Sequence, residues 1–395
     1  LKRWCVFLSL KEGLGEIKDI EFMKISENWL RTWVNPAVDS NTLSDQLTML
    51  GLEVDDLSPA AKPFTGVVVG EVLTVEQHPD ADRLRVTTVN IGSGEPLQIV
   101  CGAPNVRVGM KAPVATIGAV LPGDFKIKKG KLRGIESQGM LCGASEIDLE
   151  DKIDGLLELP VDAPVGVDIR EYLNLDDHVI DISITPNRGD CFSIRGIARE
   201  IGVINQLTVT APEINAVAAT IADEKKVVVS TEGCPRYLGR VIKNVNTKAA
   251  TPEWMERALV RSGIRQHSIL VDITNYVLME LGQPLHAFDA AKIQGSVQVR
   301  QANTAEKLVL LNEQEVELNE KVMVIADDEK ALAIAGIMGG LSSSVTDETQ
   351  DIFLESAFFA PLAIAGRARS FGLHTDASQR YERGVDFELP MLAMH

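Results

Sequence analysis

Two ionisable side chains lie in segments where a charge would cost free energy unless a ligand or a reaction made use of it. Glu355 lies among apolar residues in IFLESAFF, which would partly remove its carboxylate from water. His286 lies in QPLHAFD, in a polar break after a helical pattern at 273–280, where an imidazole can position a water molecule. Each also has a plain structural interpretation: Glu355 could end a strand in solvent or form a salt bridge, and His286 could be a core or turn histidine. The residue types alone leave both interpretations open.

Smaller residues near these two could shape a binding pocket. Asn275 precedes His286 and could hydrogen-bond the same ligand. Gly339, in the segment IMGG, allows close backbone approach and a positive φ, although a tight turn needs the same freedom. Thr375 and Ala377 lie in LHTDASQRYERG, where a small alanine leaves room for a ring.

Several familiar catalytic patterns are missing from the sequence. It contains no G-x-x-x-x-G-K-[ST], no H-E-x-x-H and no G-x-S-x-G, which argues against a Walker phosphate site, a metalloprotease and the common serine hydrolases. The five cysteines are scattered without a C-x-x-C pair, so we expect neither a disulfide framework nor a cysteine zinc site. We predict no metal ligands and no covalent nucleophile, so that any hydrolysis would use water directly.

A basic run stands out in the N-terminal half. Lys126, Lys128, Lys129, Lys131 and Arg133 lie close together in FKIKKGKLRG, and such clusters bind phosphates through counterion release. If the run forms one strand, the first two lysines share one face and the other three residues share the opposite face. The alternative interpretation is a charged edge strand that prevents pairing with other chains.

Length and charge limit the possible classes of protein. The 395 residues predict two to four domains. The net charge of −17 argues against a general nucleic-acid coat and against binding to anionic membranes, but leaves room for a local basic patch. No apolar run approaches the length of a membrane span, and we expect a cytoplasmic protein with no membrane partner. Residues 1–22 carry no clear pattern, and we interpret them as leader or upstream sequence before Met23.

Turn signals and apolar periodicity predict an α+β multidomain fold. A helix is expected at 42–50, and short strands separated by Gly, Pro, Asn and Asp at 66–147 suggest a small barrel. A strand, a turn and a helix from about Asp190 to Asn205 follow. Further strands are predicted at 297–302, 307–311, 322–326 and 351–355.

One part of the barrel region carries a recognisable motif. His78, Pro79, Asp82 and Leu84 fit the pattern H-P-x-A-D-x-L, and CGAPN at 101–105 and SQGM at 137–140 follow it. Together these segments resemble the tRNA-binding OB-fold module of several synthetases and synthetase cofactors. OB-folds bind single strands through grooves and stacking platforms. Aromatic residues are scarce here, with only Phe64 and Phe125 available.

Longer motifs extend the resemblance over 23–395. ISENWLRTW, TPNRGDC, CPRYLGR, DITNYVLMELGQPLHAFD, IAGIMGG and GLHTDASQRYERGVD occur in an order that resembles the beta-chain family of bacterial phenylalanyl-tRNA synthetases. The resemblance implies a split N-terminal α/β domain of the B1 type (23–60 with 171–220), an OB-fold β-barrel insertion (61–170) and a mixed α/β B3/B4 editing domain (221–395). It also implies that the chain is the N-terminal fragment of a longer beta chain.

The resemblance assigns a function to the C-terminal part. The B3/B4 domain of the family hydrolyses tyrosine wrongly attached to tRNA(Phe), because an apolar pocket rejects an added hydroxyl group only weakly. By this match Glu355 binds the para-hydroxyl group, and His286 positions a water or binds the ester end as a second catalytic residue. Asn275, Gly339, Thr375 and Ala377 line the amino-acid pocket. Arg380, in the last motif, could contact the tRNA end or lie in a solvated loop.

The whole enzyme of the family is a phenylalanine–tRNA ligase. The resemblance implies an α2β2 tetramer whose alpha chain uses ATP and Mg²⁺ to charge tRNA(Phe), while this segment needs no cofactor. A second hypothesis from another class is a tRNA- or protein-docking platform without catalysis, suggested by the basic run and the OB module. Loss of activity in Glu355→Ala would favour the enzyme, whereas salt-sensitive RNA binding without activity would favour the platform.

Overall fold

The computed structural model describes residues 21–149 and 154–395. The chain forms two compact units: one contains residues up to Leu57 and from Ile180 to His395, and the other runs from Ser58 to Val179. The interpretation of residues 1–22 as leader sequence concerns a segment that lies, but for its last two residues, outside the described residues. No helix among the described residues has the length and apolar composition needed to cross a membrane.

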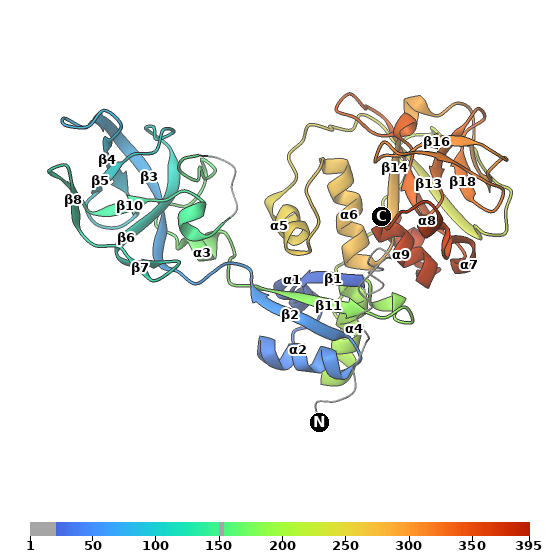
Figure 1. The fold of residues 1–395 in the computed structure, drawn as a ribbon, viewed down its shortest axis with the longest axis horizontal. Helices are drawn as coiled ribbons and strands as arrows, with labels where there is room; N and C mark the ends of the chain where they lie inside the picture. The colour runs from blue at the N-terminus through green and yellow to red at the C-terminus, as the bar shows by residue number, and fades with distance from the viewer. Residues whose placement is uncertain (1–20, 150–153) are drawn as a thin grey trace, which may run out of the picture. The chain divides into compact units, whose positions relative to one another are not determined.

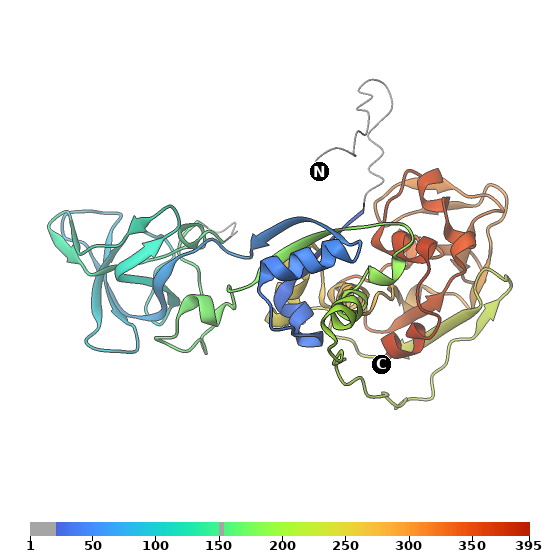
Figure 2. The same ribbon diagram turned by 90° about the horizontal axis from the view of Figure 1, so that it is seen from below.

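The first unit begins with a small α/β layer assembled from two distant stretches of the chain. A three-stranded sheet in the order β1-β11-β2 packs against three helices through one apolar core (Figures 1 and 2). Its elements are β1 (Glu21–Ser26), α1 (Glu27–Trp33), α2 (Ser40–Met49), β2 (Glu53–Pro59), β11 (His178–Ile184) and α4 (Ile194–Asn205). The predicted helix start at Asp190 is wrong, because Ser193 accepts a hydrogen bond from the Gly196 amide and caps α4 at Ile194.

The second unit is built on one curled sheet with the order β10-β6-β3-β4-β5. Its elements are β3 (Thr65–Gln77), β4 (Arg85–Asn90), β5 (Leu97–Cys101), β6 (Lys111–Leu121), β7 (Phe125–Lys126), β8 (Gly130–Leu132), β9 (Ile135–Ser137), β10 (Gly139–Leu141) and α3 (Ile169–Tyr172). The two ends of the sheet approach each other, since the amide of Gln138 donates to the carbonyl of Gln98 over 2.8 Å. The sheet is therefore a half-barrel that curls toward closure.

The basic run does not form one continuous strand. The chain forms two short strands there, β7 and β8, with an irregular segment between them. Ile127 turns inward into the core, and Arg133 has a φ of 44°, which no extended strand adopts. The lysines therefore project from a turn-rich segment.

The rest of the first unit is a larger α/β body. A three-stranded sheet in the order β13-β21-β14 and a five-stranded sheet in the order β12-β15-β18-β19-β20 form its centre. The strands are β12 (Val227–Val229), β13 (Arg236–Ile242), β14 (Leu285–Asp289), β15 (Val297–Gln301), β16 (Lys307–Val309), β17 (Glu315–Glu317), β18 (Met323–Ala326), β19 (Ala331–Ile334), β20 (Met338–Gly339) and β21 (Ile352–Phe358). The helices are α5 (Glu253–Arg261), α6 (Ile269–Leu281), α7 (Pro361–Ile364), α8 (Arg367–Ser370), α9 (Asp376–Arg383) and α10 (Leu389–Met394).

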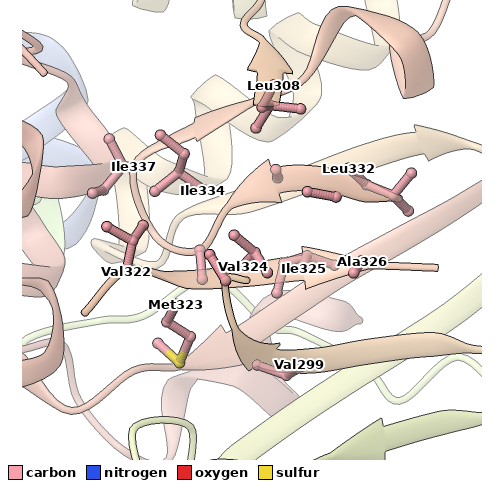
Figure 3. Close-up of a cluster of buried hydrophobic side chains, with 14 of the residues drawn as sticks. Val299, Leu308, Val322, Met323, Val324, Ile325, Ala326, Leu332, Ile334 and Ile337 are labelled. Carbon is pink, nitrogen blue, oxygen red and sulfur yellow. The ribbon is translucent and has the colours of Figure 1, made fainter. Parts of the chain in front are cut away.

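The five-stranded sheet supplies the rigid core of this body. Every residue of β18 and β19 is buried, as expected for strands covered on both faces. Their side chains pack with Val299 of β15 and Leu308 of β16 in one continuous cluster (Figure 3). The loop from β19 to β20 contributes Ala335 and Ile337 to this cluster and also forms one wall of the cavity described next.

Candidate active site

A cavity of about 260 Å³ lies between the two sheets and two helices of the first unit. Its walls come from α6, β14, the segment from β19 to β20, β21 and the start of α9. Most of the lining is apolar, including Leu278, Phe288 and Ile334. All six residues predicted for the pocket line it: Asn275, His286, Gly339, Glu355, Thr375 and Ala377.

Strand register brings the two ionisable residues together. His286 of β14 and Glu355 of β21 are directly opposed in an antiparallel pair, so both side chains leave the same face of the sheet. On the other side of β21, Gly239 of β13 opposes Glu355. The central strand thus presents its carboxylate between an imidazole and a position without a side chain.

Glu355 is a buried carboxylate with one strong hydrogen bond. Its side chain is 6% exposed, and Oε2 accepts from the hydroxyl group of Tyr237 over 2.7 Å. Burial raises the pKa of Glu355 from 4.5 to about 7, although the bond from Tyr237 lowers it. Near neutral pH the group therefore exists in both protonation states, which is typical of functional carboxylates.

His286 is held in its neutral form. Burial lowers its pKa from 6.5 to about 4, and its Nε2 atom has no hydrogen-bond partner among the described residues. The ring packs edge-on against Phe288, with ring centroids 4.4 Å apart. Its other neighbour is Gly339, where an added Cβ would lie 2.5 Å from Cε1 and 2.7 Å from Nε2. Glycine is therefore required at 339 for the imidazole to occupy this position.

The remaining predicted residues frame the cavity. Thr375 caps α9: its hydroxyl group donates to the carbonyl of Ile337 over 2.8 Å and accepts from the amide of Ser378. Both hydrogen bonds of this hydroxyl group stabilise the fold, so Thr375 contributes to the site by shaping the cavity wall. Ala377 packs against the apolar cluster, and Asn275 lines the wall formed by α6.

Sequence reasoning missed two tyrosines at the site. Tyr237 contacts Glu355, and Tyr381 lines the cavity while its hydroxyl group donates to the carbonyl of Ala357 over 3.0 Å. The position of Arg380 fits neither a contact with the tRNA end nor a solvated loop. Arg380 is only 2% exposed, and its Nε donates to the carbonyl of Phe192, so it holds α9 in place.

One group of potential metal ligands occurs among the described residues. Ligand atoms of Asp190, Cys191 and Glu200 lie within 4.8 Å of one another. The guanidinium of Arg188 lies among them, 2.9 Å from Cys191 Sγ and 2.9 Å from a Glu200 oxygen. The cation position is thus taken by arginine, and the sulfur of Cys191 is not a ligand that Mg²⁺ prefers.

The second unit has a hollow of about 650 Å³ beside the basic run. Lys126, Lys128 and the 59% exposed Phe125 lie on its rim. The other basic residues of the run lie outside this lining, and Lys129 pairs with Glu136 over 2.8 Å. Lys126 and Lys128 therefore line the hollow and the other three basic residues do not, although the run is not the single strand for which two faces were considered.

The motif histidine of this unit has a structural role. His78 is 2% exposed, its Nδ1 accepts from the amide of Asp80, and its Nε2 lies 3.1 Å from the carbonyl of Leu132. It therefore joins the loop after β3 to β8.

Comparisons with known proteins agree on the two parts of the chain. The family model of the B3/4 domain matches residues 233–395, and that of a putative tRNA binding domain matches residues 67–168. The phenylalanine–tRNA ligase beta subunit of Acinetobacter baylyi is 82% identical over 94% of this chain and 47% of its own length. The corresponding protein of Psychrobacter arcticus is 66% identical, with the same shares covered.

The chain spans about half the length of these curated relatives. Among solved structures, an N-terminal fragment of the phenylalanyl-tRNA synthetase beta-subunit from Pyrococcus horikoshii aligns with 85% of this chain and 68% of its own, at 11% identity and a TM-score of 0.32. A similarity at that level carries no argument.

Proposed function

We propose, from the premise that this chain belongs to the family of phenylalanine–tRNA ligase beta subunits, that its cavity hydrolyses tyrosine wrongly attached to tRNA(Phe). The observation that carries the proposal is the buried carboxylate of Glu355 at an apolar cavity. Such a group is expensive to bury, and a ligand hydroxyl group that donates to it offsets part of that cost.

The selectivity follows from the different hydrogen bonds that tyrosine and phenylalanine can form with Glu355. The ring of either amino acid fits the apolar walls, but only tyrosine carries a hydroxyl group that can donate to Glu355. With phenylalanine the carboxylate would lose access to water without gaining a partner, at a cost of about 1–3 kcal/mol. This corresponds to a preference for the tyrosyl ester of roughly 5- to 150-fold. A second site must add such a preference, because the apolar site that attaches the amino acid to tRNA discriminates only weakly against tyrosine.

His286 serves the polar chemistry in this proposal. At neutral pH its imidazole is uncharged, and its unpaired Nε2 can hold a water molecule or the polar end of the substrate. Water adds to the ester carbonyl, the bond to the ribose oxygen breaks, and the water proton ends on that oxygen. The cavity contributes by holding the ester and the water in position.

The test is deacylation of tyrosyl-tRNA(Phe) and phenylalanyl-tRNA(Phe) by this chain and by Glu355→Ala. We expect selective hydrolysis of the tyrosyl ester by the unmodified chain and loss of the selectivity in the variant. Equal hydrolysis of both esters, or an unchanged preference in Glu355→Ala, would refute the assignment. Circular dichroism of both proteins supplies the folding control.

The same premise extends the proposal to the whole protein. We propose three domains, B1-like (23–60 with 171–220), OB-fold (61–170) and B3/B4 editing (221–395), with the curled sheet and its Gln138–Gln98 bond as support for the OB-fold. The complete beta chain would join an alpha chain in an α2β2 tetramer in the cytoplasm. There ATP and Mg²⁺ would supply the activation of phenylalanine before it is attached to tRNA(Phe).

A second candidate function is an RNA-docking role for the second unit. It is favoured by the exposed Phe125, which lines the hollow together with Lys126 and Lys128, because a ring and nearby lysines suit a stacked base and its phosphates. Binding of tRNA(Phe) that weakens steeply with salt, without any deacylation, would support docking alone.

A further inference from the structure

Tyr237 forms a hydrogen bond with Glu355 but does not line the cavity. The phenol hydroxyl group donates to Oε2 over 2.7 Å, a typical length for a bond between a hydroxyl and a carboxylate. In the β13–β21 ladder Tyr237 opposes Ala357, while Glu355 opposes Gly239. Tyrosine and glutamate are thus diagonal neighbours on one face of the sheet, within reach of long side chains.

The position of the phenol relative to the cavity defines what it can do. Glu355 lines the cavity, whereas Tyr237 is absent from the lining as described. Tyr237 therefore contacts the carboxylate without occupying the space for a ligand. Since Oε2 is taken by this bond, Oε1 is the oxygen left for a ligand hydroxyl group.

In the part of the chain that the structure describes, the other groups that face Glu355 have other hydrogen-bond partners or none. His286 is directly opposed in β14, and its Nε2 has no partner among the described residues. The thiol of Cys234 donates to the carbonyl of Arg236, and the hydroxyl group of Tyr381 donates to that of Ala357. Tyr237 is therefore the donor that fixes the carboxylate.

We propose that Tyr237 is a positioning residue of the cavity: its hydroxyl group anchors one oxygen of Glu355 and keeps the carboxylate aimed at the hydroxyl group of the bound amino acid. The inference rests on the proposed editing function. Glutamate has several rotatable bonds, and without this anchor the carboxylate would lose both its fixed direction and the hydrogen bond from Tyr237.

The anchor also determines the charge of Glu355 at neutral pH. The bond from Tyr237 favours the carboxylate over the acid, against burial, which raises the pKa to about 7. Removing the bond must raise the pKa further. A hydrogen bond to a charged group changes such an equilibrium by about tenfold, so the ionised fraction at pH 7 would fall roughly fivefold and recover by pH 9.

The test is the pH profile of tyrosyl-tRNA(Phe) deacylation by this chain and by Tyr237→Phe, corrected for spontaneous hydrolysis. We expect the variant to be slower by at least fivefold at pH 7. The part of this loss that comes from ionisation should disappear by pH 9, and the loss that remains there measures the lost direction of the carboxylate. Tyr276→Phe is the matched control, because the Tyr276 hydroxyl group donates to another glutamate, the half-buried Glu280, over 3.3 Å. The control should leave the profile unmoved.

Two further variants separate the possible failures. In a Glu355→Gln background, Tyr237→Phe should no longer move the profile; if Tyr237→Phe alone does not fold, recovery of folding in this double variant supports the same pairing. An unshifted profile in folded Tyr237→Phe, or an equal shift in Tyr276→Phe, overturns the inference while editing stands. Absence of tyrosyl selectivity in the unmodified chain overturns the proposed function itself.

Discussion

Replacing Glu355 by glutamine should stabilise the protein at alkaline pH while impairing the proposed reaction. Burial raises the pKa of Glu355 from 4.5 to about 7, so ionising the group opposes folding. Below pH 4.5 the group is neutral in both the folded and unfolded chains, and the penalty is absent. The penalty grows as the pH rises and is complete above about pH 7.

The size of the effect follows from this pKa difference. At about 1.4 kcal/mol per pH unit, the ionised carboxylate costs about 3 kcal/mol of unfolding free energy at pH 8. Glutamine removes that cost and can still accept from Tyr237 through its carbonyl oxygen, but it buries an NH₂ group that would need an acceptor, at about 1 kcal/mol. We therefore expect Glu355→Gln to gain about 2 kcal/mol at pH 8, or about 4 °C in Tm, and nearly nothing at pH 5.

Thermal unfolding at both pH values, followed by tryptophan fluorescence, measures this difference. Trp29, Trp33 and Trp254 all belong to the unit that contains the cavity, and residues 58–179 contain no tryptophan. Glu348→Gln, at an exposed carboxylate in the same unit, is the control. The same gain at pH 5 and pH 8, or a loss at pH 8, would refute a desolvated Glu355.

Three other changes test the site and the second unit. His286→Asn should remove an acid sensitivity of about 2 kcal/mol at pH 5, because a histidine whose pKa falls from 6.5 to about 4 loses stability as the pH drops through that range; urea unfolding at pH 5 and pH 7 with an unchanged difference would contradict this. Gly339→Ala should displace the imidazole and reduce deacylation by at least tenfold, whereas Gly102→Ala, whose added Cβ meets nothing closer than 3.4 Å, should not. If the second unit binds tRNA, Lys126→Ala with Lys128→Ala should lower the slope of log affinity against log salt by about 2, and a slope that does not change would exclude contact at this rim.

The sequence predicted which residues line the cavity better than it predicted how those residues are arranged. Motifs identified Asn275, His286 and Glu355 although long stretches of chain separate them. Alternation along a strand can show which residues share a face, but it cannot show which strands pair. The direct opposition of His286 and Glu355 is a property of the β14–β21 register, and only the folded chain reveals it.

The same limit explains the missed tyrosine. Tyr237 lies in the motif CPRYLGR, but the pairing of this segment with β21 cannot be derived from the sequence, so Tyr237 had no visible partner. One signal was present: Gly239 follows two positions later on the same face, and an added Cβ there would collide with the ring of Phe353. A glycine within a strand often marks close packing of this kind.

Glu355 lies on β21, in the sheet that faces the five-stranded sheet across the cavity. An ionised Glu355 costs about 3 kcal/mol, a large share of the stability of an ordinary domain. The strands β18 and β19 behind the cavity are wholly buried and bring an apolar cluster up to its wall (Figure 3). The free energy from burying that cluster can offset the cost of the desolvated carboxylate, because burial of each large apolar side chain contributes about 1.5–3 kcal/mol. A hydroxyl-bearing ligand would then recover part of the cost on binding, so the same desolvation that weakens the empty protein makes the bound state selective.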